Sequence, residues 1–467
     1  MERLRPMDAQ FVDAEDEDRH ASFAIASIAV FEGPAPSYKE FYAAVEGRLP
    51  LVPVYRRKLR TVPLRLGPPV WVEDPNFDLH YHLRQTALPA PGGDEQLTDL
   101  IARVMAQRLD RDFPLWEYWL VEGLSGDRWA LISKVHHCMV DGIAGLDMYR
   151  VVFDLSPEPA PAAIDTRQVH AEPTGLALAA SAAADLVARP VRGAIALAGG
   201  LARPGDAFRQ ASQTARAVTK LAASGLPATG SSLSGPISRQ RRYTWARGSL
   251  TEVKTIKRKL GGTVNDVVLA AISSGFRALL LSRGEDPKPH MVPSLIPVST
   301  RAAGDENIYD NRVSVMLADL PVHLTDPVER LAAVRAEMAA LKAMRAESAA
   351  EALVTLGRFT PYPLASLVVR LGYRLPQREI VTVTTNVPGP QQSLYALGRK
   401  LLEIIPYVPI ATNLRTGVSI FSYSGQLTFG ITGDYATTPD IGVLACGIEH
   451  GIQELTEAVQ SRAGVAG

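Results

Sequence analysis

The sequence has little of what marks several protein classes. Its 467 residues include only two cysteines, Cys138 and Cys446, which excludes a disulfide framework and a cysteine-rich zinc site. Forty-nine basic and forty-nine acidic residues cancel, so no overall charge attracts nucleic acid. No apolar run approaches the ~18 residues of a spanning helix, and no charged-then-apolar leader opens the chain. We therefore expect a cytoplasmic protein without a nucleic-acid partner, which would meet lipid only at the surface of a membrane or lipid droplet.

The composition that remains, 46% hydrophobic and 21% charged, is that of an ordinary globular protein. The length predicts two or three domains. We predict an N-terminal half over residues 1–155, a Pro/Ala-rich and partly helical linker over 156–240, and a C-terminal half over 241–467. Within the linker, residues 174–224 are rich in alanine and basic, which fits either a broken helical connection or a segment that faces a membrane or droplet.

Hydrophobic periodicity predicts a mixture of strands and helices. A short acidic run at 13–18 predicts a solvated loop. Alternating or continuous apolar runs predict strands at 22–31, 118–123, 129–135, 291–297, 310–317, 380–387, 418–423 and 427–434. Helical spacing predicts helices at 38–49, 97–109, 251–259, from 263 onward, at 326–353 and at 439–459.

The most informative stretch is an HHxxxDG pattern that runs from His136 to Gly142. The apolar run before it predicts a buried strand, and Asp141 stands where a helix would begin. The pattern thus places imidazoles at a strand end, close to a carboxylate and to a glycine where the backbone turns. A neutral imidazole can take a proton from a hydroxyl or thiol near neutral pH. We predict that His137 is a general base and that His136 is a hydrogen-bonded support.

Other interpretations of this stretch stay open. The two histidines could simply finish a strand, with Asp141 as a helix cap. Cys138 offers a thiol nucleophile, but on a strand it would point away from His137. Asp141 either orients the imidazole or pins the loop through an arginine. We favour the second role, with Arg301 as partner, because a buried carboxylate needs a cation or donors.

Two further histidines raise the question of a metal. His80 and His82 would share one face if residues 79–84 formed a strand, which would supply two ligands. No third ligand follows at a suitable spacing. We therefore expect no metal site.

The HHxxxDG pattern resembles the active-site motif of the acyltransferase superfamily that contains chloramphenicol acetyltransferase and peptide-synthetase condensation domains. Three further stretches are similar to the bacterial wax ester synthase/diacylglycerol acyltransferase family within it: Pro114-Leu115-Trp116, Asn265-Asp266, and Asn-Val-Pro-Gly-Pro at 386–390. The resemblance extends from about residue 6 to 455 and lapses over 156–234.

The resemblance implies an α/β fold of two chloramphenicol-acetyltransferase-like halves, each a mixed sheet flanked by helices, with an active-site channel between them. It also implies site residues. Asn265, or a strand hydroxyl at Thr384 or Thr385, would stabilise the oxyanion, Asp141 and Gly142 would hold the turn, and Trp116 would lie in the core or line the substrate tunnel.

The activity that the resemblance implies is acyl-CoA-dependent O-acyl transfer. It would make triacylglycerol from diacylglycerol, or wax esters from long-chain alcohols, by direct transfer with His137 as base and with acyl-CoA as a co-substrate rather than a bound cofactor. One alternative within the superfamily takes the acyl group from a carrier protein or acylates another alcohol. A different class is a lipid-binding or droplet-coating protein without catalysis.

Overall fold

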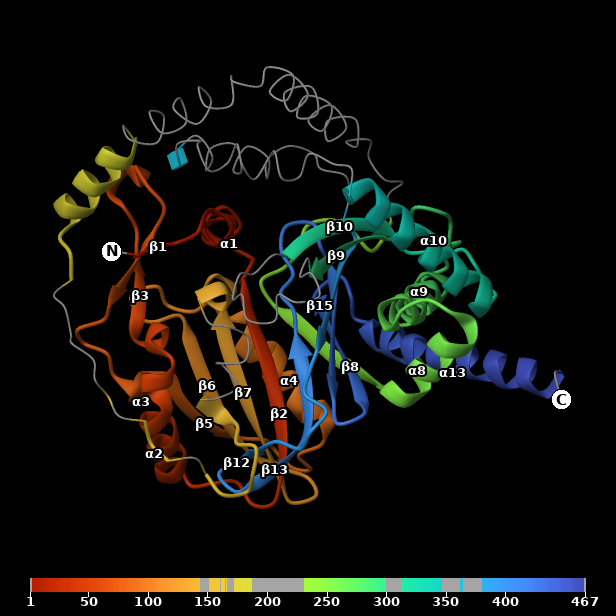
Figure 1. Ribbon diagram of the computed structural model, residues 1–467, viewed down its shortest axis with the longest axis horizontal. Helices are drawn as coiled ribbons and strands as arrows, with labels where there is room; N and C mark the ends of the chain where they lie inside the picture. The colour runs from red at the N-terminus through yellow and green to blue at the C-terminus, as the bar shows by residue number, and fades with distance from the viewer. Residues whose placement is uncertain are drawn as a thin grey trace.

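The structure is a computed structural model that describes residues 2–142, 151–159, 161–163, 165, 172–186, 231–299, 313–346, 362–363 and 380–465. Within these ranges the strands form two six-stranded sheets and one three-stranded sheet. Figure 1 shows the N-terminal sheet on one side of the molecule and the C-terminal sheet, with its helices, on the other.

The first six-stranded sheet is built mainly from the N-terminal part of the chain. The elements of this part are β1 (Glu2–Arg3), α1 (Pro6–Glu17), β2 (Ala24–Glu32), α2 (Tyr38–Arg48), η1 (Leu49–Leu51), η2 (Pro53–Arg56), β3 (Arg57–Arg60), η3 (Pro63–Arg65), β4 (Val70–Glu73), α3 (Leu79–His82), β5 (Leu83–Ala87), α4 (Asp94–Ala106), β6 (Trp116–Leu124), β7 (Arg128–His136) and η4 (His137–Gly142). Strands β2, β7 and β6 are antiparallel neighbours, and β5 runs parallel to β6 at the edge. Strands β1, β4 and β3 form the separate three-stranded sheet.

The second six-stranded sheet comes from the C-terminal part of the chain. The elements of this part are β8 (Arg241–Ser249), α8 (Leu250–Leu260), α9 (Val264–Ser282), β9 (Pro293–Ser299), β10 (Val313–Asp319), α10 (Pro327–Ala346), β11 (Thr382–Pro388), β12 (Tyr395–Ala396), β13 (Arg399–Tyr407), β14 (Thr416–Tyr423), β15 (Gln426–Asp434) and α13 (Ile441–Val465). The strand order is β10-β9-β11-β14-β15-β8, with β11 parallel to both of its neighbours. Figure 1 shows α8, α9, α10 and α13 on the side of this sheet away from the first.

Helix α9 lies at the centre of this helical layer. By length and composition alone it is apolar enough to cross a membrane, but 72% of its most apolar window is buried inside the protein. It packs against α13 and α10, and its buried residues belong to the core beneath the second sheet. Core packing therefore accounts for its apolar sequence.

A strand from the C-terminal part completes the first sheet. Strand β13 pairs antiparallel with β2, and the sheet has the order β12-β13-β2-β7-β6-β5. The carbonyl of Pro406 on β13 accepts a hydrogen bond of 2.9 Å from the hydroxyl of Ser419 on β14. Gly430 of β15 faces the same carbonyl, and any side chain there would overlap it. The two sheets thus meet where β13 passes β14 and β15.

The two faces of β14 belong to two different hydrophobic cores. Val418 and Ile420 pack in the core beneath α9, whereas Phe421 and Tyr423 pack in the core of the N-terminal part. Side chains alternate between the faces of a strand, so β14 presents one face to the helices and the other to the N-terminal half.

The predicted fold class is confirmed, and most of the predicted strands and helices lie within a few residues of the observed ones. The acidic run at 13–18 is not a solvated loop, because helix α1 extends to Glu17 and buries Asp13 and Glu15. Residues 79–82 form a helical turn rather than a strand. The sequence did not predict seven of the observed strands, which are β1, β3, β4, β5, β8, β12 and β13. The domain limits stay predictions, since most of the 156–240 linker lies outside the described residues.

Candidate active site

Strand β7 delivers the two histidines of the HHxxxDG pattern to one end of the first sheet. His136 is its last residue and pairs with Ala24 of β2, and His137 begins η4. The peptide N–H of His137 donates to the carbonyl of Phe23, at 2.9 Å. Because strand β7 ends at His136, the side chain of His137 does not follow the alternating up-and-down pattern of a strand, which the sequence predicts for it. His137 is half-buried, whereas His136 is only 1% exposed.

The imidazole of His137 lies against helix α1. It stacks on the ring of Phe11, with centroids 4.0 Å apart and planes inclined by 29°. Phe11 in turn contacts the ring of Phe23, with centroids 5.7 Å apart. A stacked neighbour fixes the plane of an imidazole without using the in-plane nitrogens, which are the groups that exchange protons. The stack therefore suits a ring that works as a base.

His136 is held by hydrogen bonds inside the protein. Its Nδ1 accepts a hydrogen bond from the peptide N–H of Cys138 at 3.2 Å, and the Cys138 Sγ lies 2.9 Å from the same nitrogen. Its Nε2 lies 3.7 Å from Oε2 of Glu15. His136 thus ties the strand end to the first turn of η4.

Glu15 of helix α1 is a buried carboxylate beside His136. Its Oε2 accepts a hydrogen bond from Arg111 at 2.9 Å, and its Oε1 accepts one from the peptide N–H of Phe23 at 3.1 Å. Burial alone would raise the pKa of Glu15, but His136, Arg111 and the N–H of Phe23 stabilise the anion and lower it to about 2. Glu15 is therefore charged at neutral pH.

The sequence interpretation missed Glu15 and Phe11, although a signal was present. Pro6 can open a helix, and Asp8, Phe11 and Glu15 follow at three- and four-residue spacings on one helical face. The acidic residues around Glu15 hid this pattern, since a charge run is most often a solvated surface.

Cys138 is not placed to act as a nucleophile. Its side chain is 2% exposed, and burial is the main reason why its pKa lies well above the ordinary value. The nearby carboxylate of Asp8 raises this pKa further. A buried thiol that stays protonated packs like a small apolar group.

The residues that close the HHxxxDG pattern are only partly described. Asp141 and Gly142 are the last two residues of η4. Arg301 and residues 143–150, which make up most of the helix predicted after Asp141, lie outside the described residues. The pairing of Asp141 with Arg301 stays a prediction.

Asn265 lies in the first turn of α9 but does not cap the helix. The cap is Thr263, whose hydroxyl accepts from the N–H of Asp266 while the Asp266 carboxylate accepts from the N–H of Thr263. The Oδ1 of Asn265 accepts a hydrogen bond from Asn386 Nδ2 of β11, at 3.3 Å. Asn265 is therefore not the cap of this helix, and its amide links α9 to β11.

The two candidate threonines of β11 face opposite ways. Thr384 is opposite Val418 of β14 and so shares the face that the helices cover, where its oxygen accepts a hydrogen bond from Ser294 at 2.9 Å. Thr385 is opposite Ser419, on the face that β14 presents to the N-terminal half. Thr385 is also half-buried, whereas Thr384 is 1% exposed. Of the two, Thr385 is on the face where a channel between the halves would lie.

Trp116 and the histidines of α3 belong to an aromatic cluster. Trp116 is fully buried between Tyr55 and His82, with ring centroids at 4.5 and 4.4 Å, so it presents no surface to a substrate. His82 is buried against the Trp116 carbonyl, and burial lowers its pKa to about 4. His80 contacts the Tyr38 hydroxyl instead, so the two histidines do not converge. Within the described ranges no three His, Cys, Asp or Glu side chains group as metal ligands.

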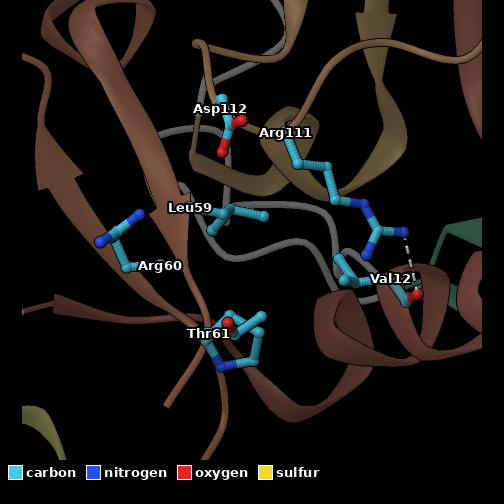
Figure 2. Close-up of a pocket in the computed structure, with 7 residues that line it drawn as sticks. Val12, Leu59, Arg60, Thr61, Arg111 and Asp112 are labelled. Carbon is cyan, nitrogen blue, oxygen red and sulfur yellow. Dashed lines mark hydrogen bonds between the residues drawn. The ribbon is translucent and has the colours of Figure 1, made fainter. Parts of the chain in front are cut away.

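A small cavity lies between α1, β3 and the segment that carries Arg111 and Asp112. Its volume is about 110 Å³, and Figure 2 shows Arg111 reaching across it towards the carbonyl of Val12, to which it donates at 3.3 Å. Ligand sites for small molecules usually measure several hundred Å³, so we assign no substrate to this cavity. The residues that line it are Val12, Leu59, Arg60, Thr61, Pro69, Arg111 and Asp112.

Comparison with known proteins gives consistent matches over almost the whole chain. Residues 4–268 match the family described as wax ester synthase/diacylglycerol acyltransferase catalytic domain, and residues 309–456 match the C-terminal domain of the same family. A probable diacylglycerol O-acyltransferase, tgs1, of Mycobacterium tuberculosis is 40% identical over 99% of this chain and 97% of its own length.

Solved structures agree with the sequence matches. The wax ester synthase/diacylglycerol acyltransferase of Marinobacter aquaeolei VT8 is 25% identical, with a TM-score of 0.70 over 98% of this chain and 100% of that one. The starter condensation domain of rhizomide synthetase RzmA shares the fold, with a TM-score of 0.58, 17% identity, and coverage of 98% of this chain and 94% of that one.

Proposed function

The chain belongs to the wax ester synthase/diacylglycerol acyltransferase family and is an O-acyltransferase. From this premise we propose that it transfers a long-chain acyl group from acyl-CoA to diacylglycerol, which gives triacylglycerol, or to a long-chain alcohol, which gives a wax ester. The relatives named as diacylglycerol acyltransferases support the first acceptor, and the solved relative supports both.

The proposed chemistry is a direct transfer with His137 as the base. His137 takes the proton of the acceptor hydroxyl as the alcohol oxygen attacks the thioester carbonyl carbon. The tetrahedral intermediate then collapses, the carbon–sulfur bond breaks, and the departing thiolate of CoA takes the proton back from the imidazolium. The products are the ester and free CoA. No acyl-enzyme is needed, because the thioester is already activated and both substrates meet at one base.

Two groups are candidates for stabilising the oxyanion of that intermediate. The amide of Asn265 is held at the N-terminus of α9 by Asn386, and the Thr385 hydroxyl lies on the inward face of β11. Either is a neutral donor of the kind that stabilises negative charge when it is positioned in advance. Asp141 and Gly142 are proposed to hold the turn of η4.

The observation that carries the proposal is that His137 is half-buried, with its ring stacked on Phe11, beside a fully buried His136. The test is release of CoA from palmitoyl-CoA, with diacylglycerol or hexadecanol as acceptor. His137→Ala should lower kcat by about 10²- to 10⁴-fold with unchanged thermal stability. His450→Ala, at an exposed histidine of α13, is the matched control and should keep full activity.

Other outcomes of the same assay would replace the proposal. Turnover that persists in His137→Ala would remove His137 as the base. Transfer from an acyl-carrier protein but not from palmitoyl-CoA would point to a different donor. Lipid binding without any thioester consumption would make the protein a lipid carrier or droplet coat.

We also propose that the enzyme works in the cytoplasm. It would act at the surface of a membrane or lipid droplet, because its proposed acceptors are insoluble in water. Two exposed leucines support a lipid contact. Leu64 is 90% exposed and Leu176, on a short apolar helix, is 82% exposed. Their segments adjoin, since Gly175 lies against Pro63. Exposed apolar side chains on adjoining segments are typical of surfaces that meet lipid or another protein.

A further inference from the structure

We propose that Glu15 is a positioning residue for the acyl transfer. From helix α1 its carboxylate fixes the tautomer of His136 and the backbone of the turn that presents His137. The inference rests on the proposed role of His137 as the base. It gives helix α1, which carries none of the sequence-predicted site residues, a part in the reaction.

The hydrogen bonds of His136 decide which ring nitrogen carries its proton. Its Nδ1 accepts a hydrogen bond from the peptide N–H of Cys138, so this nitrogen carries no proton. A neutral imidazole then carries its proton on Nε2. The Glu15 carboxylate lies 3.7 Å from Nε2, and within the described residues no hydrogen bond satisfies this buried nitrogen. An anion on that side favours the tautomer that the Cys138 contact requires.

Glu15 also holds the backbone that anchors His137. Glu15 Oε1 accepts from the peptide N–H of Phe23, and the carbonyl of the same residue accepts from the N–H of His137. The peptide N–H of Phe23 is therefore bound to Glu15, and its carbonyl is bound to His137, the first residue of η4. A carboxylate that holds this residue also holds the carbonyl that anchors His137.

Helix α1 meets both histidines with one of its faces. Phe11 and Glu15 are four residues apart, so their side chains lie one above the other on one face of α1. This face meets two consecutive histidines, with Phe11 stacked on the His137 ring and Glu15 beside His136. One helical turn thus supports both members of the histidine pair.

Arg111 keeps the Glu15 carboxylate in place, and it provides the control for an experiment. Its two terminal nitrogens bind Glu15 at 2.9 Å and Asp16 at 2.6 Å. Asp16 is the next residue of the helix and pairs with the same arginine, but it is not among the partners of His136. Replacing Asp16 therefore loosens Arg111 without removing the anion from the histidine.

The experiment compares Glu15→Gln with Asp16→Asn in the full-length protein. With palmitoyl-CoA and the better acceptor, Glu15→Gln should lower kcat by about 10- to 100-fold. The KM values for the acyl-CoA and for the alcohol should change by less than about twofold, because a displaced His137 ring slows proton transfer more than it weakens substrate binding. Asp16→Asn should keep kcat within about twofold. A Glu15→Asp variant keeps the charge but draws it back by one methylene, and should fall between the two.

A second measurement does not depend on turnover. Nitrogen-15 NMR of histidine-labelled protein distinguishes protonated from unprotonated ring nitrogens, and the His136 signals can be assigned by their loss in His136→Asn. Wild-type His136 should show a protonated Nε2 and an unprotonated Nδ1. Glu15→Gln should shift the ring towards a mixture of tautomers.

The outcomes separate this inference from the proposed function. Wild-type kcat in Glu15→Gln, an equal loss in Asp16→Asn, or an unchanged His136 tautomer would each overturn the positioning role while acyl transfer stands. If the wild-type protein consumes no palmitoyl-CoA with any alcohol, the proposed function fails, and the NMR measurement still decides whether Glu15 holds His136. If Glu15→Gln does not fold, Glu15→Asp supplies both readouts.

Discussion

Replacing Glu15 by glutamine should destabilise the protein at neutral pH, and the destabilisation should shrink in acid. Burial on its own would raise the pKa of Glu15, but His136, Arg111 and the peptide N–H of Phe23 stabilise the anion and lower the pKa from 4.5 to about 2. The folded protein therefore prefers the charged carboxylate more strongly than the unfolded chain does. That preference is a contribution to stability that glutamine, similar in shape but uncharged, does not make.

The size of this contribution follows from the pKa difference. A change from 4.5 to about 2 corresponds to about 3 kcal/mol of unfolding free energy. The contribution is complete above the unfolded value of 4.5 and is lost as the pH falls from there to about 2. About 2 kcal/mol of it should be gone by about pH 3, where the unfolded carboxyl is protonated and the folded one is still mostly charged.

Urea unfolding followed by tryptophan fluorescence measures this directly, at about pH 7 and about pH 3. The wild-type protein should be more stable than Glu15→Gln by about 3 kcal/mol at the higher pH and by about 1 kcal/mol at the lower. A difference that stays the same at both pH values would mean that the folded state does not favour the anion, and would refute the network that we describe around Glu15.

Two further pairs of substitutions test the architecture of the site. Thr385→Val should lower kcat by about 10²-fold if its hydroxyl stabilises the oxyanion. Thr384→Val should instead lower the unfolding free energy by about 1–3 kcal/mol and leave kcat unchanged. The reverse pattern in kinetics and urea unfolding would contradict the assignment of the two threonines to opposite faces of β11. Gly430→Ala should lower unfolding free energy by about 3 kcal/mol or more, because its new methyl group meets a backbone carbonyl of β13. Gly442→Ala on α13 has open space around it and should be neutral or slightly stabilising in thermal denaturation, and equal effects of the two would show that the sheets do not meet at Gly430.

The sequence predicts well whatever depends on neighbouring residues. The strands predicted at 118–123 and 129–135 appear as β6 and β7, because runs of apolar residues are local signals. The resemblance, carried by short motifs in a fixed order, also correctly predicted the family and the two-sheet fold.

The sequence does not predict contacts between distant segments. Glu15 reads as part of a solvated acidic run until Arg111, nearly a hundred positions further on, is known to face it. Thr384 and Thr385 are equivalent in sequence, and only the register with β14 separates a helix-facing hydroxyl from an inward-facing one. Both cases depend on pairings that the local pattern leaves open.

The place of β13 in the first sheet constrains the order of events during synthesis. Strand β2 leaves the ribosome early, but its partner on one edge is made near the end of the chain. Until then the nascent chain exposes an unpaired strand edge, which is a site for aggregation and a binding site for chaperones. Expression of an N-terminal fragment alone should therefore give insoluble material, and synthesis that pauses before residue 395 should do the same.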